Sequence, residues 1–140
     1  MLDDVYNTKI IELASNIELI GRLSNPDSTA TKVSRLCGSK VVVDIKFENN
    51  KVIDFAHDVK ACALGQASSS IMAKNVIGSS KEELIDIADI MLKMLKEDGP
   101  VPVGKWSDLA YLEPVREYKS RHSSTMLVFE AVNEAINKIT

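Results

Sequence analysis

The stretch VVVDIKFENNKVIDFAHDVK, residues 41–60, decides the fold of this chain. Its first half alternates apolar and polar residues, which is the period-two pattern of a strand with one buried face. Its second half alternates in the same way, and the side predicted to face the core carries Ile53, Phe55, His57 and Val59. Between the halves lies Asn49-Asn50, and asparagine tolerates the positive φ of a tight turn. The stretch predicts a β-hairpin in which His57 has a structural role.

The segments before the hairpin predict one helix and one further strand. Apolar residues recur at helical spacing from Tyr6 to Ile20, and Gly21 is placed to end that helix. The polar residues 24–29 predict a loop. Residues 31–36 are rich in β-branched side chains and predict a third strand.

After the hairpin the pattern changes to that of helices. We predict helices over 65–77 and 123–139, with one or two short helical turns over 106–112. Ser80 and Glu83 form a capping box that opens another helix ending before Gly99. Strands followed by helices favour an α+β fold, in which a small antiparallel three-stranded sheet with the hairpin at 40–60 packs against N- and C-terminal helices.

Composition limits the class of protein. The chain has 140 residues, the size of one core, and we expect a single domain over 1–140. No apolar run approaches the roughly 20 residues needed to cross a bilayer, so no membrane segment is expected. The acidic start lacks a targeting pattern and predicts a cytoplasmic protein. The net charge is −3 and the basic residues are dispersed, so no nucleic-acid partner is expected.

The two cysteines, Cys37 and Cys62, flank the hairpin. Antiparallel strands bring their outer ends together, so both thiols are expected at one end of the sheet. Each could instead be a small buried side chain. Cys62 also precedes the helix predicted over 65–77, where free backbone N–H groups stabilise the negative charge that a metal-binding thiolate carries. His122 begins the last helix and is either an exposed surface residue or a further metal ligand.

Several motifs taken in order resemble the NifU/IscU/SufU family of iron–sulfur cluster scaffolds. Leu36-Cys37-Gly38 resembles the Cys-Gly-Asp that these proteins carry before the hairpin. The run from Lys60 to Ser70, KACALGQASSS, resembles their second cysteine and the small residues after it. Residues 112–121 resemble the segment that leads to their third cysteine. The long stretch between Cys62 and that segment is more similar to the SufU branch, and the resemblance covers the chain from its first helix onward.

The chain departs from that pattern at two positions. Ser39 stands where the family has its aspartate. The third cysteine falls at Ser124 if Leu127 and Ala131 set the alignment, or at Ser123 if His122 sets it, and we prefer Ser124. A serine hydroxyl is a poor ligand for iron compared with a thiolate. The resemblance therefore implies Cys37 and Cys62 as ligands, with His122 as a candidate third.

The resemblance implies a scaffold that is not an enzyme. Such a protein receives sulfur from a cysteine desulfurase, assembles a [2Fe–2S] cluster from iron and sulfide, and passes it to apo-proteins. A chaperone is a further candidate partner, and a homodimer stays open. Two alternatives remain: a zinc-dependent sulfur acceptor that works with the desulfurase, and a degenerate adaptor that binds no metal.

Overall fold

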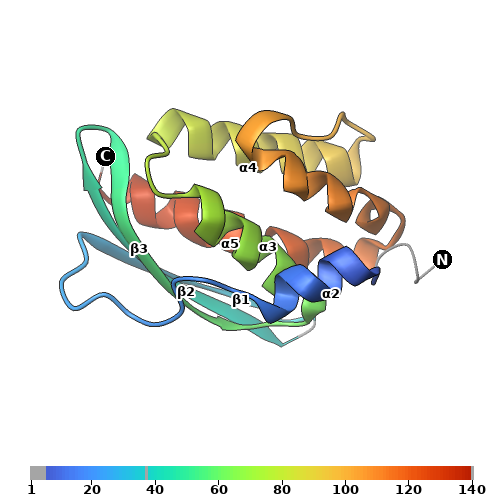
Figure 1. The fold of residues 1–140 in the computed structure, drawn as a ribbon, viewed down its shortest axis with the longest axis horizontal. Helices are drawn as coiled ribbons and strands as arrows, with labels where there is room; N and C mark the ends of the chain where they lie inside the picture. The colour runs from blue at the N-terminus through green and yellow to red at the C-terminus, as the bar shows by residue number, and fades with distance from the viewer. Residues whose placement is uncertain (1–5, 37, 140) are drawn as a thin grey trace.

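The computed structural model describes residues 6–36 and 38–139 and has the α+β architecture that the sequence predicts. A three-stranded antiparallel sheet of β1 (Ser28–Ser34), β2 (Ser39–Glu48) and β3 (Lys51–Lys60) forms one layer. The helices α3 (Ala63–Asn75) and α5 (His122–Asn137) lie next to it, and α2 (Thr8–Ser15) packs against α3, as Figure 1 shows. The helix α4 (Lys81–Lys96) and the 3-10 helix η1 (Gly104–Glu117) form the outer layer (Figure 1). A short 3-10 helix, η2 (Lys119–Arg121), leads into α5.

The hairpin is confirmed. Strands β2 and β3 pair from Lys40 opposite Lys60 to Glu48 opposite Lys51. Asn49 and Asn50 both have positive φ, 53° and 59°, which is the conformation that two-residue hairpin turns require. The third strand is also confirmed, although it begins at Ser28 within the expected loop and ends at Ser34.

One assignment of the buried face is wrong. Ile53 was expected to face the core, but it is 48% exposed, whereas its neighbour Val52 is buried. The pairing of β2 with β3 shifts by one residue between Lys46 and Phe47. Such a bulge reverses the inward and outward alternation beyond it. Phe55 lies on the unshifted side and is buried as predicted.

The first helix is shorter than its apolar spacing suggests. It ends at Ser15 rather than at Gly21, and Leu19 has a positive φ of 59°. The backbone beyond it pairs with β3 instead, since the His57 N–H donates to the Leu19 carbonyl at 3.1 Å and the Gly21 N–H donates to the His57 carbonyl at 2.9 Å. Because these backbone groups form hydrogen bonds with the edge strand β3, they do not require the hydrogen bonds of a longer helix.

This N-terminal strap, residues 16–23, is held to the sheet by two buried polar side chains. The His57 ring is fully buried, and its Nε2 lies 2.8 Å from the Glu18 carbonyl, as its predicted structural role requires. Asp44 is also fully buried and accepts hydrogen bonds from the Arg22 guanidinium at 2.6 Å and from the Leu23 N–H at 3.0 Å. The strap therefore supplies hydrogen-bond partners to His57 and Asp44, and these partners offset the cost of burying the two polar side chains.

The central and last helices follow the prediction within two residues. The helix α3 begins at Ala63 and is buried on nearly every side, because it lies between α2 and α5. The helix α5 buries Leu127, Val128, Val132 and Ile136 against the sheet and α4. Ser80 caps α4, since its Oγ accepts the Glu83 N–H at 3.1 Å.

The segment expected to form one or two short turns over 106–112 forms a longer 3-10 helix, η1. Its buried side chains are Trp106, Leu109, Leu112 and Val115, one every third residue. A 3-10 helix has three residues per turn, so this spacing places all four side chains on one face.

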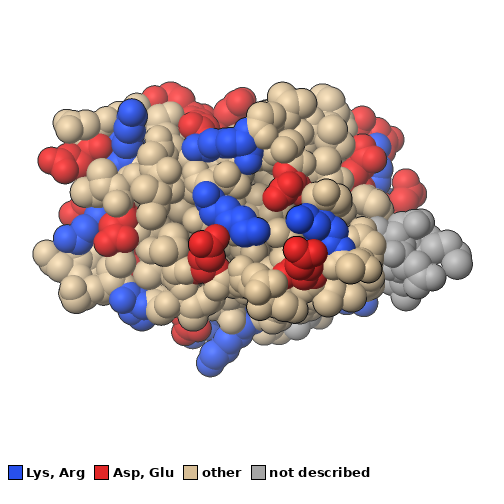
Figure 2. All heavy atoms as spheres, in the orientation of Figure 1, with Lys and Arg blue, Asp and Glu red and all other residues tan. Residues whose placement is uncertain are grey.

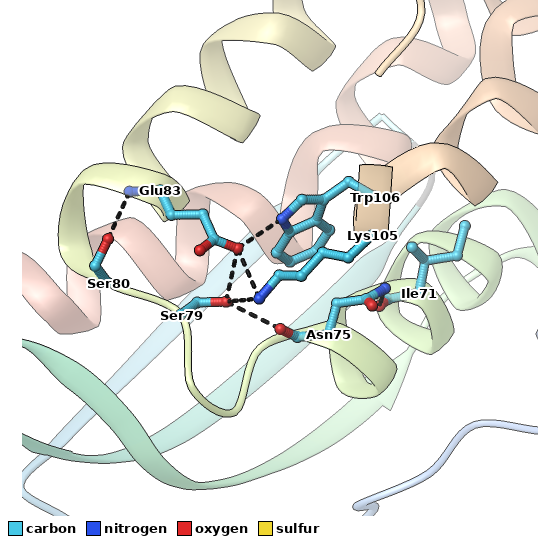
Figure 3. A network of polar contacts seen from close by, with 7 residues as sticks. All are labelled: Ile71, Asn75, Ser79, Ser80, Glu83, Lys105 and Trp106. Atoms are coloured by element: carbon cyan, nitrogen blue, oxygen red, sulfur yellow. Dashed lines mark hydrogen bonds and ion pairs between the residues drawn. The ribbon is translucent and has the colours of Figure 1, made fainter. Parts of the chain in front are cut away.

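A polar network fastens the start of η1 to α4 (Figure 3). The Glu83 carboxylate accepts from Trp106 Nε1 at 2.8 Å and pairs with Lys105 Nζ at 2.7 Å. Ser79 donates to the same carboxylate at 3.1 Å and accepts from Lys105 at 2.9 Å. Although burial opposes the charge, these hydrogen bonds and Lys105 hold the pKa of Glu83 below its usual value. Glu83, the acidic residue of the predicted capping box, therefore uses its carboxylate for contacts with η1 and Ser79.

Basic and acidic side chains alternate over the face that Figure 2 presents. Within the described ranges, no helix is long and apolar enough to cross a membrane.

Candidate metal and cluster site

Cys62 lies at one end of the sheet, directly before α3. It follows β3, whose Lys60 pairs with Lys40 at the start of β2. It is the N-cap residue of α3 and is partly exposed, with no hydrogen bond from its side chain to the helix N–H groups. The expected position at a helix start is therefore confirmed. Cys37, the other predicted ligand, lies outside the described residues.

The thiol of Cys62 points toward α5. Its Sγ donates to the Ser124 Oγ at 3.4 Å, and Ser124 donates in turn to the Arg121 carbonyl at 3.2 Å. Ser124 is buried, with 1% of its surface exposed. Ser124 is thus the serine whose hydroxyl faces Cys62, and it is also the residue that we preferred as the substitute for the family's third cysteine.

Ser123, the other candidate for that position, faces elsewhere. Its Oγ lies 2.8 Å from the Oγ of Ser34 at the end of β1, so this pair joins the sheet to the start of α5. Ser39, which replaces the family's aspartate, is buried and pairs with Ser34 across the two strands. Hydroxyls therefore lie at the positions where the resemblance to the family implies a carboxylate and a thiolate.

Gly65 lets α3 approach α5 at this point. A Cβ on Gly65 would lie 2.8 Å from the Cβ of Ala61 and 3.1 Å from the Ser124 carbonyl oxygen. The first distance is closer than real side chains come, so any larger residue would force Ala61 to move and would crowd the Ser124 carbonyl. The small residue serves close packing of the two helices on which the site is built.

His122 is not an exposed surface residue, and that alternative is wrong. Only 6% of its surface is exposed, and its Nε2 lies 3.0 Å from the Val115 carbonyl and 3.2 Å from the Arg116 carbonyl. Two carbonyl oxygens can only accept, so Nε2 must carry the proton and donate. The lone pair that could bind a metal in the neutral ring is therefore on Nδ1.

Among residues 6–36 and 38–139, no three His, Cys, Asp or Glu side chains come together as a metal site. The described part of the site thus offers one thiol, that of Cys62, with the Ser124 hydroxyl as its hydrogen-bond partner. A single thiolate at a helix start can bind a soft metal or accept sulfur, but it cannot hold either firmly by itself.

Sequence reasoning missed Ser34, because nothing in the sequence indicates that a hydroxyl at the end of β1 reaches Ser123. The separation of 89 residues between the two is bridged only in the tertiary structure. Ser124, in contrast, is the residue that the resemblance to the family indicated.

Comparison with known proteins supports the resemblance seen in the sequence. The family model described as the NifU-like N terminal domain matches residues 5–137. The chain is 24% identical over 136 residues to the iron–sulfur cluster assembly scaffold protein IscU of Thermotoga maritima, an alignment that covers 97% of this chain and 95% of that protein. It is also 24% identical over 141 residues to the zinc-dependent sulfurtransferase SufU of Bacillus subtilis, covering 98% and 92%.

Solved structures are similar over the whole length. A nitrogen-fixing NifU-like protein (N-terminal) from Brucella abortus is 56% identical, with a TM-score of 0.97, covering 99% of this chain and 96% of that one. A structure described as a putative iron–sulfur cluster assembly scaffold protein for the SUF system, from Fervidobacterium islandicum, has a TM-score of 0.87 at 19% identity, covering 96% and 98%. The second likeness concerns the fold alone.

Proposed function

Because the chain belongs to the family of NifU-like N-terminal domains, we propose that it is a scaffold of iron–sulfur cluster assembly. It binds iron and a transient [2Fe–2S] cluster through Cys37 and Cys62 and transfers the cluster to apo-proteins. The scaffold proteins of this family are not catalytic enzymes, in agreement with the prediction from the sequence.

One observation carries the proposal for this chain itself. Cys62 is partly exposed at the start of α3, and its thiol lies 3.4 Å from the hydroxyl of Ser124. This contact supports the interpretation that Ser124 stands at the position of the family's third cysteine. A thiolate at an exposed edge can receive cargo from one protein and release it to another.

The ligand count makes the cargo labile. A [2Fe–2S] cluster has four terminal positions, and two thiolates fill only half of them. His122 could add a ligand only through Nδ1, because Nε2 is hydrogen-bonded to the carbonyls of Val115 and Arg116. A second copy of the chain or a small external thiol would supply the remaining ligands. Weak retention suits a protein that must give its cluster away.

The proposed partners follow from this function. A cysteine desulfurase supplies sulfur, and apo-proteins accept the cluster, as the relationship to the scaffold proteins implies. A chaperone that recognises residues 112–121 would meet a folded segment, since Leu112 and Val115 are buried. It would have to bind the exposed side chains or follow local unfolding of η1.

A zinc-dependent sulfur acceptor is the second candidate function. It is favoured by the relative from Bacillus subtilis, which is described as a zinc-dependent sulfurtransferase and matches nearly the whole chain. Cys37, Cys62 and His122 would hold zinc with one open position, as reactive zinc sites do. A degenerate adaptor without metal is favoured by the serines at positions 39 and 124.

The first experiment measures iron, acid-labile sulfide and zinc in protein purified without oxygen, together with its visible absorption spectrum. Iron and sulfide in similar amounts with a brown chromophore are the expected result for a scaffold. Zinc without sulfide would replace the scaffold proposal with the sulfur acceptor. Protein without either metal after reconstitution would leave only the adaptor.

A further inference from the structure

A cavity of about 460 Å³ lies apart from Cys62, where the end of α4, the 3-10 helices η1 and η2, and the start of α5 meet. Three cations line it, Lys96, Arg116 and Lys119, together with two acids, Asp98 and Glu117. The cavity lining therefore carries a net charge of +1, whereas the whole chain carries −3. We name this cavity the Arg116 pocket. Its volume is within the range of small-ligand sites in proteins.

Arg116 is fixed in place before any ligand arrives. Its guanidinium donates to the Gly99 carbonyl at 3.1 Å and to the Glu113 carboxylate at 3.2 Å, and it lies 3.5 Å from Asp98. Only 19% of the side chain is exposed. Its Nε–H is buried without an acceptor among the described residues. A guanidinium held this rigidly loses little conformational freedom when it binds a carboxylate.

The charge of Arg116 is only partly neutralised. Asp98 and Glu113 are themselves exposed, by 83% and 45% of their side chains, so solvent screens these ion pairs. The other two cations, Lys96 and Lys119, form no salt bridge with any residue in the described ranges. Three cations thus line one cavity, and their charge is only partly neutralised.

Hydrogen-bond acceptors line the same cavity. Asp98 and Glu117 contribute carboxylates. These acids disfavour a doubly charged anion such as phosphate. A ligand that combines one negative charge with N–H donors would satisfy both sets of groups. The carboxylate and last amide N–H groups of a peptide chain have this chemistry.

We propose that the Arg116 pocket binds the C-terminal carboxylate of a partner polypeptide. The carboxylate pairs with Arg116 and the two lysines, and the last peptide N–H groups donate to Asp98 or Glu117. Leu95 supplies the apolar lining for the terminal side chain. This binding needs no metal at Cys62, so it goes beyond the proposed scaffold function and does not depend on it.

The test titrates the full chain with the acetylated tripeptide Ala-Ala-Leu and follows amide chemical shifts by NMR. The free acid is expected to bind with a dissociation constant on the order of 1 mM and to shift residues around Arg116. The peptide with a C-terminal amide is expected to bind at least tenfold more weakly. Lys119→Glu should weaken binding of the free acid about tenfold, because it reverses one of the three positive charges that line the pocket.

Lys74→Glu is the matched control, since it makes the same charge change at an exposed helix residue outside the pocket. It should leave the affinity unchanged, and so should Cys62→Ala, which separates this inference from the proposed function. Circular dichroism checks that each variant is folded. Equal affinity for acid and amide, tighter binding of inorganic phosphate, or no shifts at 10 mM peptide would each overturn the proposal.

Discussion

The Cys62 thiol and the Ser124 hydroxyl form the contact of the proposed site that the structure describes. The two atoms are 3.4 Å apart. Two thiolates bound to one tetrahedral zinc are about 3.8 Å apart, given zinc–sulfur bonds of about 2.3 Å. A sulfur in place of the Ser124 oxygen would therefore need only a small adjustment to share a metal with Cys62.

Ser124→Cys is expected to slow loss of the metal or cluster at least tenfold, because it adds a soft ligand beside Cys62. The measurement is the decay of the visible chromophore, or the release of zinc to a chelator, under anaerobic conditions. Ser123→Cys is the matched control, because the Ser123 Oγ faces Ser34 and not Cys62. Equal half-lives for the two variants would contradict the assignment of Ser124 as the vacated position.

Cys62→Ala is expected to abolish binding of iron and zinc while leaving the fold intact. The thiol is partly exposed and makes no hydrogen bond to the N–H groups of α3, so its removal does not uncap the helix. Metal content measured after reconstitution, with circular dichroism as the control for folding, checks this. Unchanged metal content in a folded variant would remove Cys62 from the site.

At the scale of the elements, one side chain of α4 holds the start of η1. Glu83 in α4 accepts the buried Trp106 Nε1–H and pairs with Lys105, both at the start of η1 (Figure 3). The ion pair with Lys105 contributes little, because both partners are more than one third exposed. The hydrogen bond to Trp106 contributes more, because a buried donor without an acceptor is costly.

Glu83→Ala should lower the free energy of unfolding by about 1–3 kcal/mol, since it leaves Trp106 Nε1 without its acceptor. Glu82→Ala removes the neighbouring carboxylate in the same first turn of α4 and should cost only about 0.5 kcal/mol. Denaturant unfolding of both variants checks the difference. Glu82 accepts one exposed hydrogen bond, from Asn50, so equal losses would mean that the link to η1 adds nothing beyond an exposed contact of this kind.

The helices and strands differ in how far the sequence could predict them. Alternation over residues 41–60 predicted the hairpin because a strand with one buried face requires that pattern. A period of three in the buried residues of η1 would have predicted a 3-10 helix; these residues are Trp106, Leu109, Leu112 and Val115. Such a helix is seldom expected, because most 3-10 helices are only three or four residues long, whereas η1 has 14. The bulge beside Phe47 had no signal, since it depends on how two strands meet.

At the scale of the whole molecule, the N-terminal strap makes stability depend on pH. Burial lowers the pKa of His57 below its ordinary value of 6.5, although the Glu18 carbonyl and Asp58 act in the opposite direction. The pKa of Asp44 is also lowered: burial opposes its charge, but hydrogen bonds from Arg22, Thr29 and the Leu23 N–H prevail. Both side chains hold the strap to the sheet.

Stability should therefore fall as the solution becomes acidic. Below pH 6.5 the unfolded chain binds a proton at residue 57 that the folded chain resists, so the free energy of unfolding decreases as pH falls through this range. The contribution of Asp44 is present above its unfolded pKa of 3.8 and is lost as pH falls through its lower folded pKa.

His57→Gln tests the first of these two steps. Glutamine can still donate to the Glu18 carbonyl but does not titrate, so the variant should lose stability less steeply between pH 7 and pH 5 than the parent chain. Denaturant unfolding at several pH values provides the measurement. Parallel pH dependence of the two proteins would mean that His57 is not the titrating group.

The sequence by itself determined the α+β class, the hairpin, the position of Cys62 at a helix start and the family, because local periodicity and motif order carry that information. The single domain over 1–140 and the ligand roles of Cys37, Cys62 and His122 stay predictions. Only the tertiary structure decided that Ser124 rather than Ser123 faces Cys62, that His122 is buried with Nε2 bound to carbonyls, and that residues 16–23 leave the helix to cover the sheet. These features depend on contacts between segments far apart in the chain, which no local pattern encodes.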